Sequence, residues 1–171
     1  NLQDAKKPLV IIGAGCKQSN VGEELVKVFT KLSIPMAFTW GSVDLSDSSN
    51  KYNLGIIGIN GERSANMSAY LADVVLGFGT NFSDQITGRE RNYFAPNAKK
   101  FAFDIDPKEC LRLKNFAEVI NVDLREELTF ITEYIKKQEK KRIVNETTIS
   151  FLKSLKNFDQ KLEKSENYVN I

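Results

Sequence analysis

The chain has 171 residues, of which 42% are hydrophobic and 27% charged, so it can form one globular domain with its own core and is too apolar for a disordered tail. Its 24 basic and 22 acidic residues are interspersed and leave a formal charge of +2, so we expect no nucleic-acid partner. Histidine is absent, which excludes His-based acid/base catalysis, Ser/His or Cys/His dyads and His-ligated zinc.

Short, continuous apolar runs alternate with amphipathic stretches along the chain. The runs PLVIIG (8–13), PMAFTW (35–40), DVVLGFG (73–79), KKFAFDID (99–106) and EVINVD (118–123) are typical of strands buried on both faces of a parallel sheet. Apolar positions three and four apart predict helices over 21–33, 62–72 and 124–137. The alternation predicts a doubly wound α/β fold. The segment YNLGIIG (52–58) fits either a further strand or a loop that leads into the helix at 62–72.

Four of these five runs end in small or acidic residues, at 13–15, 77–79, 104–107 and 123. In an open parallel sheet, ligands bind at the carboxyl ends of the strands, where helix N-termini present free N–H groups. We therefore expect a ligand site at this edge. Asp106 followed by Pro107 also predicts a helix start by capping alone, whatever is bound.

The pattern changes after residue 138. The spacing of Ile149, Leu152, Leu155, Phe158 and Leu162 predicts one peripheral helix, and no further strand is expected. We therefore divide the chain into a domain over 1–138 and a linker with a peripheral helix over 139–171.

The cysteines and the termini bear on the compartment. Cys16 and Cys110 lack the spacing of a zinc site or a redox motif, and we expect Cys16 to be a buried small hydrophobe. No apolar run approaches the ~20 residues of a membrane span, and the opening NLQDAKKP lacks the apolar core of a signal peptide. We expect a reduced, cytoplasmic protein without a membrane partner. The chain begins with Asn rather than Met, so we expect that its natural start has been lost.

The turn IIGAGC (11–16) is an incomplete dinucleotide fingerprint. Gly13 and Gly15 are present, but Gln18 stands where G-x-G-x-x-G requires its third glycine. The two glycines are compatible with a phosphate-binding turn or with a tight strand-to-helix turn alone. Trp40 and Phe82 could stack on an aromatic ligand, but packing is the preferred interpretation of both.

Six segments, in order from Ala5 to Leu128, resemble the middle domain of thiamine diphosphate-dependent enzymes of the acetolactate synthase type. They are AKKPLVIIGAGC, LSIPMAFTWGS, LGIIGINGERSAN, ADVVLGFGTNFSDQITG, FAPNAKKFAFDIDPKE and VINVDLREEL. The resemblance implies a parallel six-stranded, Rossmann-like nucleotide-binding fold. That fold holds FAD in acetolactate synthase, ADP in oxalyl-CoA decarboxylase, and nothing in other members. The terminal ENYVNI resembles the start of a following diphosphate-binding domain, so we expect a domain excised from a larger enzyme.

The resemblance also implies which residues would contact a nucleotide. The diphosphate would lie at the first turn, the flavin beside the turns that follow, and the ribose and adenine at the last strands. The positions carried over are Gly13, Ala14, Gly15, Thr39, Trp40, Gly58, Ile59, Asn60, Gly79, Thr80, Asn81, Ser83, Gln85, Ile86, Asp104, Ile105, Asp106, Glu109, Asp123 and Leu124.

Several positions depart from the family pattern. The family loop G-x-R-F-D-D-R-x-T-G carries two arginines, which are replaced here by Asn81 and Gln85. The family's histidine in L-G-x-H-G is Asn60, and the glycine before the last aspartate is Val122. FAD, ADP and an empty site therefore all remain open. Arg89 and Arg91 could supply the lost positive charge from a neighbouring position, but a solvated helix face is the preferred interpretation of both.

In the parent family, the catalytic glutamate and the metal-binding motif lie in the flanking pyrimidine- and diphosphate-binding domains. The resemblance therefore implies a scaffold domain with no catalytic or metal-binding residues and no turnover alone. The parent would use thiamine diphosphate and Mg²⁺ for decarboxylation or carboligation of keto acids, as a homodimer or homotetramer. The alternative is a stand-alone nucleotide- or flavin-binding regulatory module with the same fold.

Overall fold

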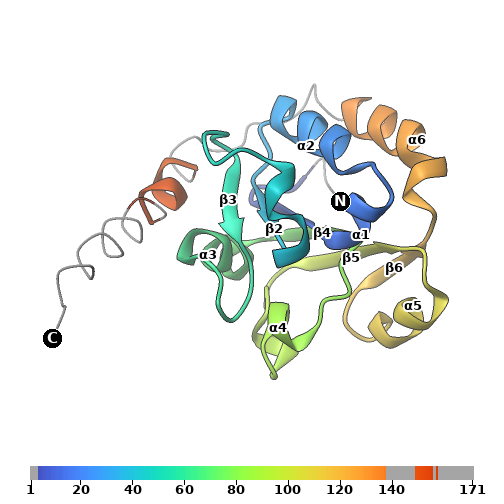
Figure 1. Ribbon diagram of the computed structural model, residues 1–171. Helices are drawn as coiled ribbons and strands as arrows, with labels where there is room; N and C mark the ends of the chain where they lie inside the picture. Colours follow the sequence, from blue (N-terminus) through green and yellow to red (C-terminus); the bar gives the residue numbers. More distant parts are fainter. Residues whose placement is uncertain (1–3, 138–148, 156, 158–171) are drawn as a thin grey trace, which may run out of the picture.

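Each apolar run expected to be a strand forms one in the computed structural model, which describes residues 4–137, 149–155 and 157 (Figure 1). The strands are β1 (Pro8–Ile12), β2 (Met36–Phe38), β3 (Asn53–Ile56), β4 (Val74–Phe78), β5 (Lys99–Asp104) and β6 (Glu118–Asn121). They form a six-stranded sheet in the order β3-β2-β1-β4-β5-β6, and every neighbouring pair is parallel. The predicted doubly wound α/β fold is confirmed.

The open question at 52–58 is decided in favour of a strand. Met36 donates its backbone N–H to the Tyr52 carbonyl oxygen at 2.7 Å, and Asn53 pairs with Met36 in the β2–β3 ladder. Leu54 is fully buried in the middle of β3. Pairing with β2 thus converts an ambiguous apolar segment into the edge strand of the sheet.

Helices cover both faces of the sheet. They are α1 (Ala14–Gln18), α2 (Gly22–Lys31), α3 (Arg63–Leu71), α4 (Asp84–Thr87), α5 (Pro107–Leu113) and α6 (Leu124–Lys137), with 3₁₀ turns η1 (Trp40–Leu45) and η2 (Arg91–Tyr93). The expected helices at 21–33, 62–72 and 124–137 correspond to α2, α3 and α6. A separate short α1 precedes α2, and Asn20, with a left-handed φ of 57°, lies between the two helices.

Alternate residues of β1 belong to two hydrophobic cores. Val10 and Ile12 pack in the core that contains the apolar faces of α2 and α6. Leu9 and Ile11 pack in the core on the opposite face, with side chains from α3 and α5. In Figure 1, α2 and α6 accordingly lie on one side of the sheet and α3 and α5 on the other. This three-layer arrangement explains why the central strands are apolar throughout.

The segment beyond α6 is described only in part. Residues 149–155 are helical, and Ile149 and Leu152 are 3% and 2% exposed, as the apolar spacing predicts. Ile149 joins the core beneath α2, whereas Leu152 and the partly buried Leu155 join the core on the opposite face. Phe158, Leu162 and the expected linker at 139–148 lie outside the described residues.

No helix in the described part of the chain is both long enough and apolar enough to cross a membrane.

Candidate functional site

The ends of four strands align at one edge of the sheet. Ile12 is in register with both Phe38 and Phe78, and Phe78 is in register with Phe103. The next residue on each strand therefore marks the carboxyl edge: Gly13, Thr39, Gly79 and Asp104. The strand order reverses between β1 and β4, which is the topological switch point where open α/β sheets bind ligands.

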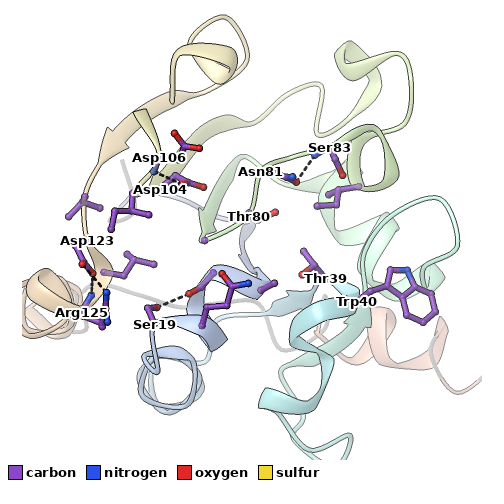
Figure 2. Close-up of a pocket in the computed structure, with 18 of the residues that line it drawn as sticks. Ser19, Thr39, Trp40, Thr80, Asn81, Ser83, Asp104, Asp106, Asp123 and Arg125 are labelled. Atoms are coloured by element: carbon purple, nitrogen blue, oxygen red, sulfur yellow. Dashed lines mark hydrogen bonds and ion pairs between the residues drawn. The ribbon is translucent and has the colours of Figure 1, made fainter. Parts of the chain in front are cut away.

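A cavity of about 580 Å³ opens at this edge (Figure 2). Its walls come from the turns after β1, β2, β4, β5 and β6. The lining residues are Ala14, Gly15, Gln18, Ser19, Thr39, Trp40, Gly79, Thr80, Asn81, Ser83, Gln85, Ile86, Asp104, Ile105, Asp106, Val122, Asp123, Leu124 and Arg125. We call this cavity the edge cleft. It gathers most of the positions carried over from the family resemblance.

Five of the carried-over positions lie outside the edge cleft. Gly13 is buried beneath the turn, and Asn60 is exposed on the neighbouring turn. Gly58 and Ile59 line a separate hollow beside α3, and Ile59 donates its N–H to the Gln85 carbonyl oxygen at 2.9 Å. Glu109 lines a third hollow beside α5. The turn at 58–60 therefore supports α4 and does not form a wall of the edge cleft.

The glycines of the first turn are accounted for by contacts within the chain. A Cβ on Gly13 would lie 2.1 Å from the Gly79 carbonyl oxygen, so the two turns pack backbone against backbone. The Gly15 amide, expected to meet a diphosphate, instead donates to that same Gly79 oxygen at 3.0 Å. The Cys16 amide donates to the Gly13 carbonyl oxygen at 3.1 Å. Neither amide is free for an anion, because the Gly15 amide joins the turns after β1 and β4 and the Cys16 amide closes the first turn.

Three carboxylates line the side of the edge cleft formed by β5 and β6. Each has one oxygen engaged by a nearby backbone amide. The Asp106 amide donates to Asp104 Oδ1 at 2.9 Å, the Lys108 amide to Asp106 Oδ1 at 2.8 Å, and the Arg125 amide to Asp123 Oδ1 at 2.9 Å. These bonds hold the carboxylates in fixed orientations at the rim.

Asp123 differs from the other two because it also has a cationic partner. The backbone amide of Arg125 lowers the pKa of Asp123, and the guanidinium of the same residue acts in the same direction. Arg125 Nη2 lies 3.4 Å from Asp123 Oδ2, and the Arg125 side chain is 62% exposed. Arg125 is thus the cation in the lining of the cleft, and it is paired there with a carboxylate.

The loop after β4 forms the opposite wall, and a buried phenylalanine holds it. Phe82 is fully buried against Phe94 and Phe116, with ring centroids 6.1 Å and 5.4 Å away. Phe82 therefore serves packing and is not available to stack on a ligand. Trp40, by contrast, is 64% exposed and extends from the rim of the edge cleft (Figure 2).

Thr80 lies on the floor of the edge cleft with an unsatisfied hydroxyl. The residue is 3% exposed, and its Oγ1 is buried without a hydrogen-bond partner in the described part of the chain. Figure 2 places Thr80 between Asp104 on one side and Asn81 on the other. A buried hydroxyl without a partner costs about 1–3 kcal/mol, so this group needs an explanation.

Two arginines near the loop do not enter the edge cleft. Arg91 Nη2 is 3.2 Å from Asp84 Oδ1, and Arg112 Nη2 is 2.7 Å from Glu109 Oε2. Arg112 also donates to the Asn81 carbonyl oxygen. Both guanidiniums line the adjoining hollow with Glu109. They therefore brace the outer side of the loop that carries Asn81 and Gln85.

Cys16 has a buried thiol that stays protonated at neutral pH. Its side chain is fully buried, and burial raises the pKa of its thiol to about 12. Its Sγ donates to the Phe78 carbonyl oxygen at 3.1 Å. The expectation of a buried small hydrophobe is confirmed.

The sequence did not single out several lining residues. Gln18 and Ser19 follow the first turn, and Arg125 follows Asp123 on α6. Gln18 and Ser19 could have been found from the position of α1 at the strand end, because residues one turn into such a helix border the same edge. Arg125 had no comparable signal, since an arginine early in a helix usually faces solvent.

Comparisons with known proteins identify relatives over most of the chain. The family described as "Thiamine pyrophosphate enzyme, central domain" matches residues 1–131. A probable acetolactate synthase large subunit of Methanococcus aeolicus is 34% identical over 123 residues, which are 72% of this chain and 19% of the relative. An acetolactate synthase large subunit of Haemophilus influenzae is 33% identical over 103 residues, 60% of this chain and 18% of the relative.

A third relative carries a different activity in its name. A 3D-(3,5/4)-trihydroxycyclohexane-1,2-dione hydrolase of Clostridium perfringens is 37% identical over 107 residues, 58% of this chain and 17% of the relative. The chain therefore spans about a fifth of the length of the curated relatives it matches.

Proposed function

This chain belongs to the family of thiamine pyrophosphate enzyme central domains, and on that premise we propose that it is the non-catalytic scaffold domain of a larger enzyme. The parent would carry out decarboxylation or carboligation of keto acids, in the manner of the acetolactate synthases that it resembles. The family match over residues 1–131 carries this proposal, together with the short share of each relative that the chain covers.

The chemistry of the chain supports a scaffold role. The sequence has no histidine, and the buried Cys16 thiol has a pKa of about 12. The carboxylates of the edge cleft accept bonds from backbone amides, and the described lining residues include no histidine, lysine or cysteine that could activate a neighbouring hydroxyl. General acid/base catalysis needs a group with a suitable pKa beside a reacting atom, and this cleft offers mainly binding groups.

The cofactors of the parent would lie mostly outside this chain. We propose that flanking pyrimidine- and diphosphate-binding domains hold thiamine diphosphate and Mg²⁺, and that the parent assembles as a homodimer or homotetramer. The edge cleft is where a nucleotide such as FAD or ADP would lie. The ribose side fits such a ligand, since carboxylates accept from ribose hydroxyls. The diphosphate side does not fit, because the Gly15 and Cys16 amides are engaged within the chain.

A thiamine diphosphate assay tests the scaffold proposal. The complete gene product, supplied with thiamine diphosphate and Mg²⁺, should release CO₂ from a 2-keto acid or join two keto acids. The 171-residue chain should not, and thiamine diphosphate should leave its Tm unchanged. Turnover by the chain alone would contradict the scaffold role. A complete product without thiamine-dependent turnover would contradict the parent activity.

The alternative is a stand-alone nucleotide- or flavin-binding module, and the edge cleft at the switch point is the observation that favours it. The same assay separates the two readings. A gene product that binds a nucleotide but neither binds nor uses thiamine diphosphate would support the module and overturn the scaffold.

A further inference from the structure

We infer that the edge cleft takes an uncharged nucleoside in preference to a nucleoside diphosphate or a dinucleotide, with Thr80 Oγ1 and the carboxylates of Asp104 and Asp106 as its polar contacts. This inference deepens the proposed function, because it names the class of ligand for the same cleft. It does not depend on which reaction the parent enzyme performs.

The unsatisfied hydroxyl of Thr80 is the first observation. Thr80 lines the edge cleft, and only 3% of its surface is exposed. Its Oγ1 has no hydrogen-bond partner in the described part of the chain. A threonine hydroxyl can both donate and accept one hydrogen bond. A ligand group that reaches the floor of the cleft would satisfy it, which removes the cost of burying it unpaired.

The free carboxylate oxygens are the second observation. Asp104 and Asp106 each use Oδ1 to accept from a backbone amide, and Oδ2 of either residue accepts no hydrogen bond from the described part of the chain. These oxygens are acceptors only. They therefore favour a ligand that presents hydroxyl or amino donors, such as the vicinal diol of a ribose, and they repel phosphate oxygens.

An apolar surface lies beside these acceptors. Ile105 is 59% exposed between the two aspartates, and Val122 and Leu124 line the adjacent wall. An exposed isoleucine next to a cavity can be covered by a planar ring with a gain in buried apolar area. Hydroxyl donors joined to a planar ring with apolar faces are the features of a nucleoside.

The cleft is poor in groups that stabilise a diphosphate. The Gly15 and Cys16 amides are used within the chain, and α1 is only five residues long. The loop presents Asn81 and Gln85 as neutral amides. Arg125 is already paired with Asp123.

Calorimetric titration of the 171-residue chain with adenosine, ADP and FAD tests the inference. We expect adenosine to bind at least tenfold more tightly than ADP or FAD at low salt. Tighter binding of ADP or FAD overturns the inference while leaving a nucleotide site in the proposed domain intact. Absence of binding by all three also overturns it, whereas the thiamine diphosphate assay decides the proposed function independently.

Neutralising the two aspartates should change the affinities for adenosine and ADP in opposite directions, which a purely structural role of the aspartates would not do. Asp104→Asn with Asp106→Asn keeps an acceptor for both backbone amides but removes two negative charges. We expect adenosine to bind about tenfold more weakly and ADP to bind more tightly. Asp44→Asn with Asp47→Asn removes the same charge outside the lining of the cleft and should change neither affinity. Parallel changes for both ligands in the first variant would contradict the inference.

Thr80→Val tests the floor contact. Valine keeps the shape and removes the unsatisfied hydroxyl, so the unliganded chain should gain about 3 °C in Tm while its affinity for adenosine falls. Thr80→Ser retains the hydroxyl and should keep the affinity within about threefold. Undiminished adenosine binding by the valine variant would remove Thr80 from the ligand contacts.

Discussion

Gly79 meets two demands at a single residue. Its φ is +55°, in the left-handed region that glycine tolerates, and a Cβ there would lie 2.7 Å from the Cys16 backbone nitrogen. Its carbonyl oxygen also accepts from the Gly15 amide. The contact between the turns after β1 and β4 thus requires a residue without a side chain at this point.

Alanine substitutions separate the two demands. Gly79→Ala should lower the free energy of unfolding by about 3 kcal/mol, through strain at positive φ and through the contact with Cys16. Gly88→Ala is the matched control, because Gly88 has φ +76° and open space around its Cβ position. It should cost only about 1 kcal/mol. Urea unfolding followed by circular dichroism measures both, and equal losses would contradict the close contact.

The buried Cys16 thiol makes the free energy of unfolding fall as the pH rises in the alkaline range. Burial raises the pKa of its thiol from 9.0 to about 12, so the folded state holds this proton more tightly than the unfolded state does. The stabilisation is complete below pH 9 and is lost as the pH rises toward the folded-state pKa. Relative to Cys16→Ala, the wild-type chain should lose about 2 kcal/mol of unfolding free energy between pH 8.5 and 10.5.

Urea unfolding at several pH values checks this dependence, and the alanine variant subtracts the titration of lysines and tyrosines. The partly buried Cys110, whose thiol pKa is also raised by burial, should show a smaller drift in a Cys110→Ala comparison. A difference between wild type and Cys16→Ala that does not change with pH would show that the thiol titrates normally.

At the scale of the element, α5 begins as its capping residues predict. Asp106 is the N-cap and accepts from the Lys108 amide at 2.8 Å, and Pro107 occupies the first helical position. The side chain replaces one of the hydrogen bonds that the first turn lacks, and proline loses nothing there. Asp106 also lines the edge cleft.

The cap has a measurable value. Asp106→Ala should destabilise the chain by about 1 kcal/mol, whereas Asp106→Asn should stay within about 0.3 kcal/mol of wild type, because asparagine caps equally well. Thermal or urea unfolding without ligand makes the comparison. Equal stability of the alanine and wild-type chains would show that α5 does not depend on this bond.

The loop after β4 is fixed by contacts with the core and with α5. Phe82 anchors it in the core, and Arg112 donates to the Asn81 carbonyl oxygen from α5. The Ser83 amide donates to Asn81 Oδ1 at 3.1 Å, which orients one of the neutral amides of the edge cleft. The wall opposite the carboxylates is therefore preorganised, as a binding site requires.

At the scale of the whole molecule, the segment after α6 contributes to the domain core. Ile149 and Leu152 lie with Pro8, Pro35 and Leu71 around a small hollow beside the start of β1. Ile149 and Leu152 also belong to the cores on opposite faces of the sheet. The described part of this segment therefore packs against the sheet.

Truncating these side chains tests that contribution. Ile149→Ala and Leu152→Ala should each lower the unfolding free energy by about 2–4 kcal/mol, through lost burial and the cavity that remains. Phe151→Ala is the control, because Phe151 is 50% exposed and should cost clearly less. Wild-type stability of both core variants would show that the segment does not pack against the domain in solution.

Much of this protein was determined by the sequence itself. Continuous apolar runs, helical periodicity and the Asp106–Pro107 cap predict five strands, three helices and one helix start, because these signals depend on neighbours within a few residues. The order of six segments also identified the family, and the strand ends indicated the edge where the cleft lies.

Only the tertiary structure decided the rest, because those features depend on segments far apart in the chain. Residues 53–56 form a strand because they pair with β2. The Gly15 amide is not available to a ligand because it donates to the Gly79 carbonyl oxygen. The Thr80 hydroxyl is buried without a hydrogen-bond partner in the described part of the chain. Arg125, in the first turn of α6, lines the edge cleft. The pattern of neighbouring residues predicts where a residue lies in its own helix or strand. Which polar groups are hydrogen-bonded, and which charges line the edge cleft, is decided only when the ends of different strands are brought together.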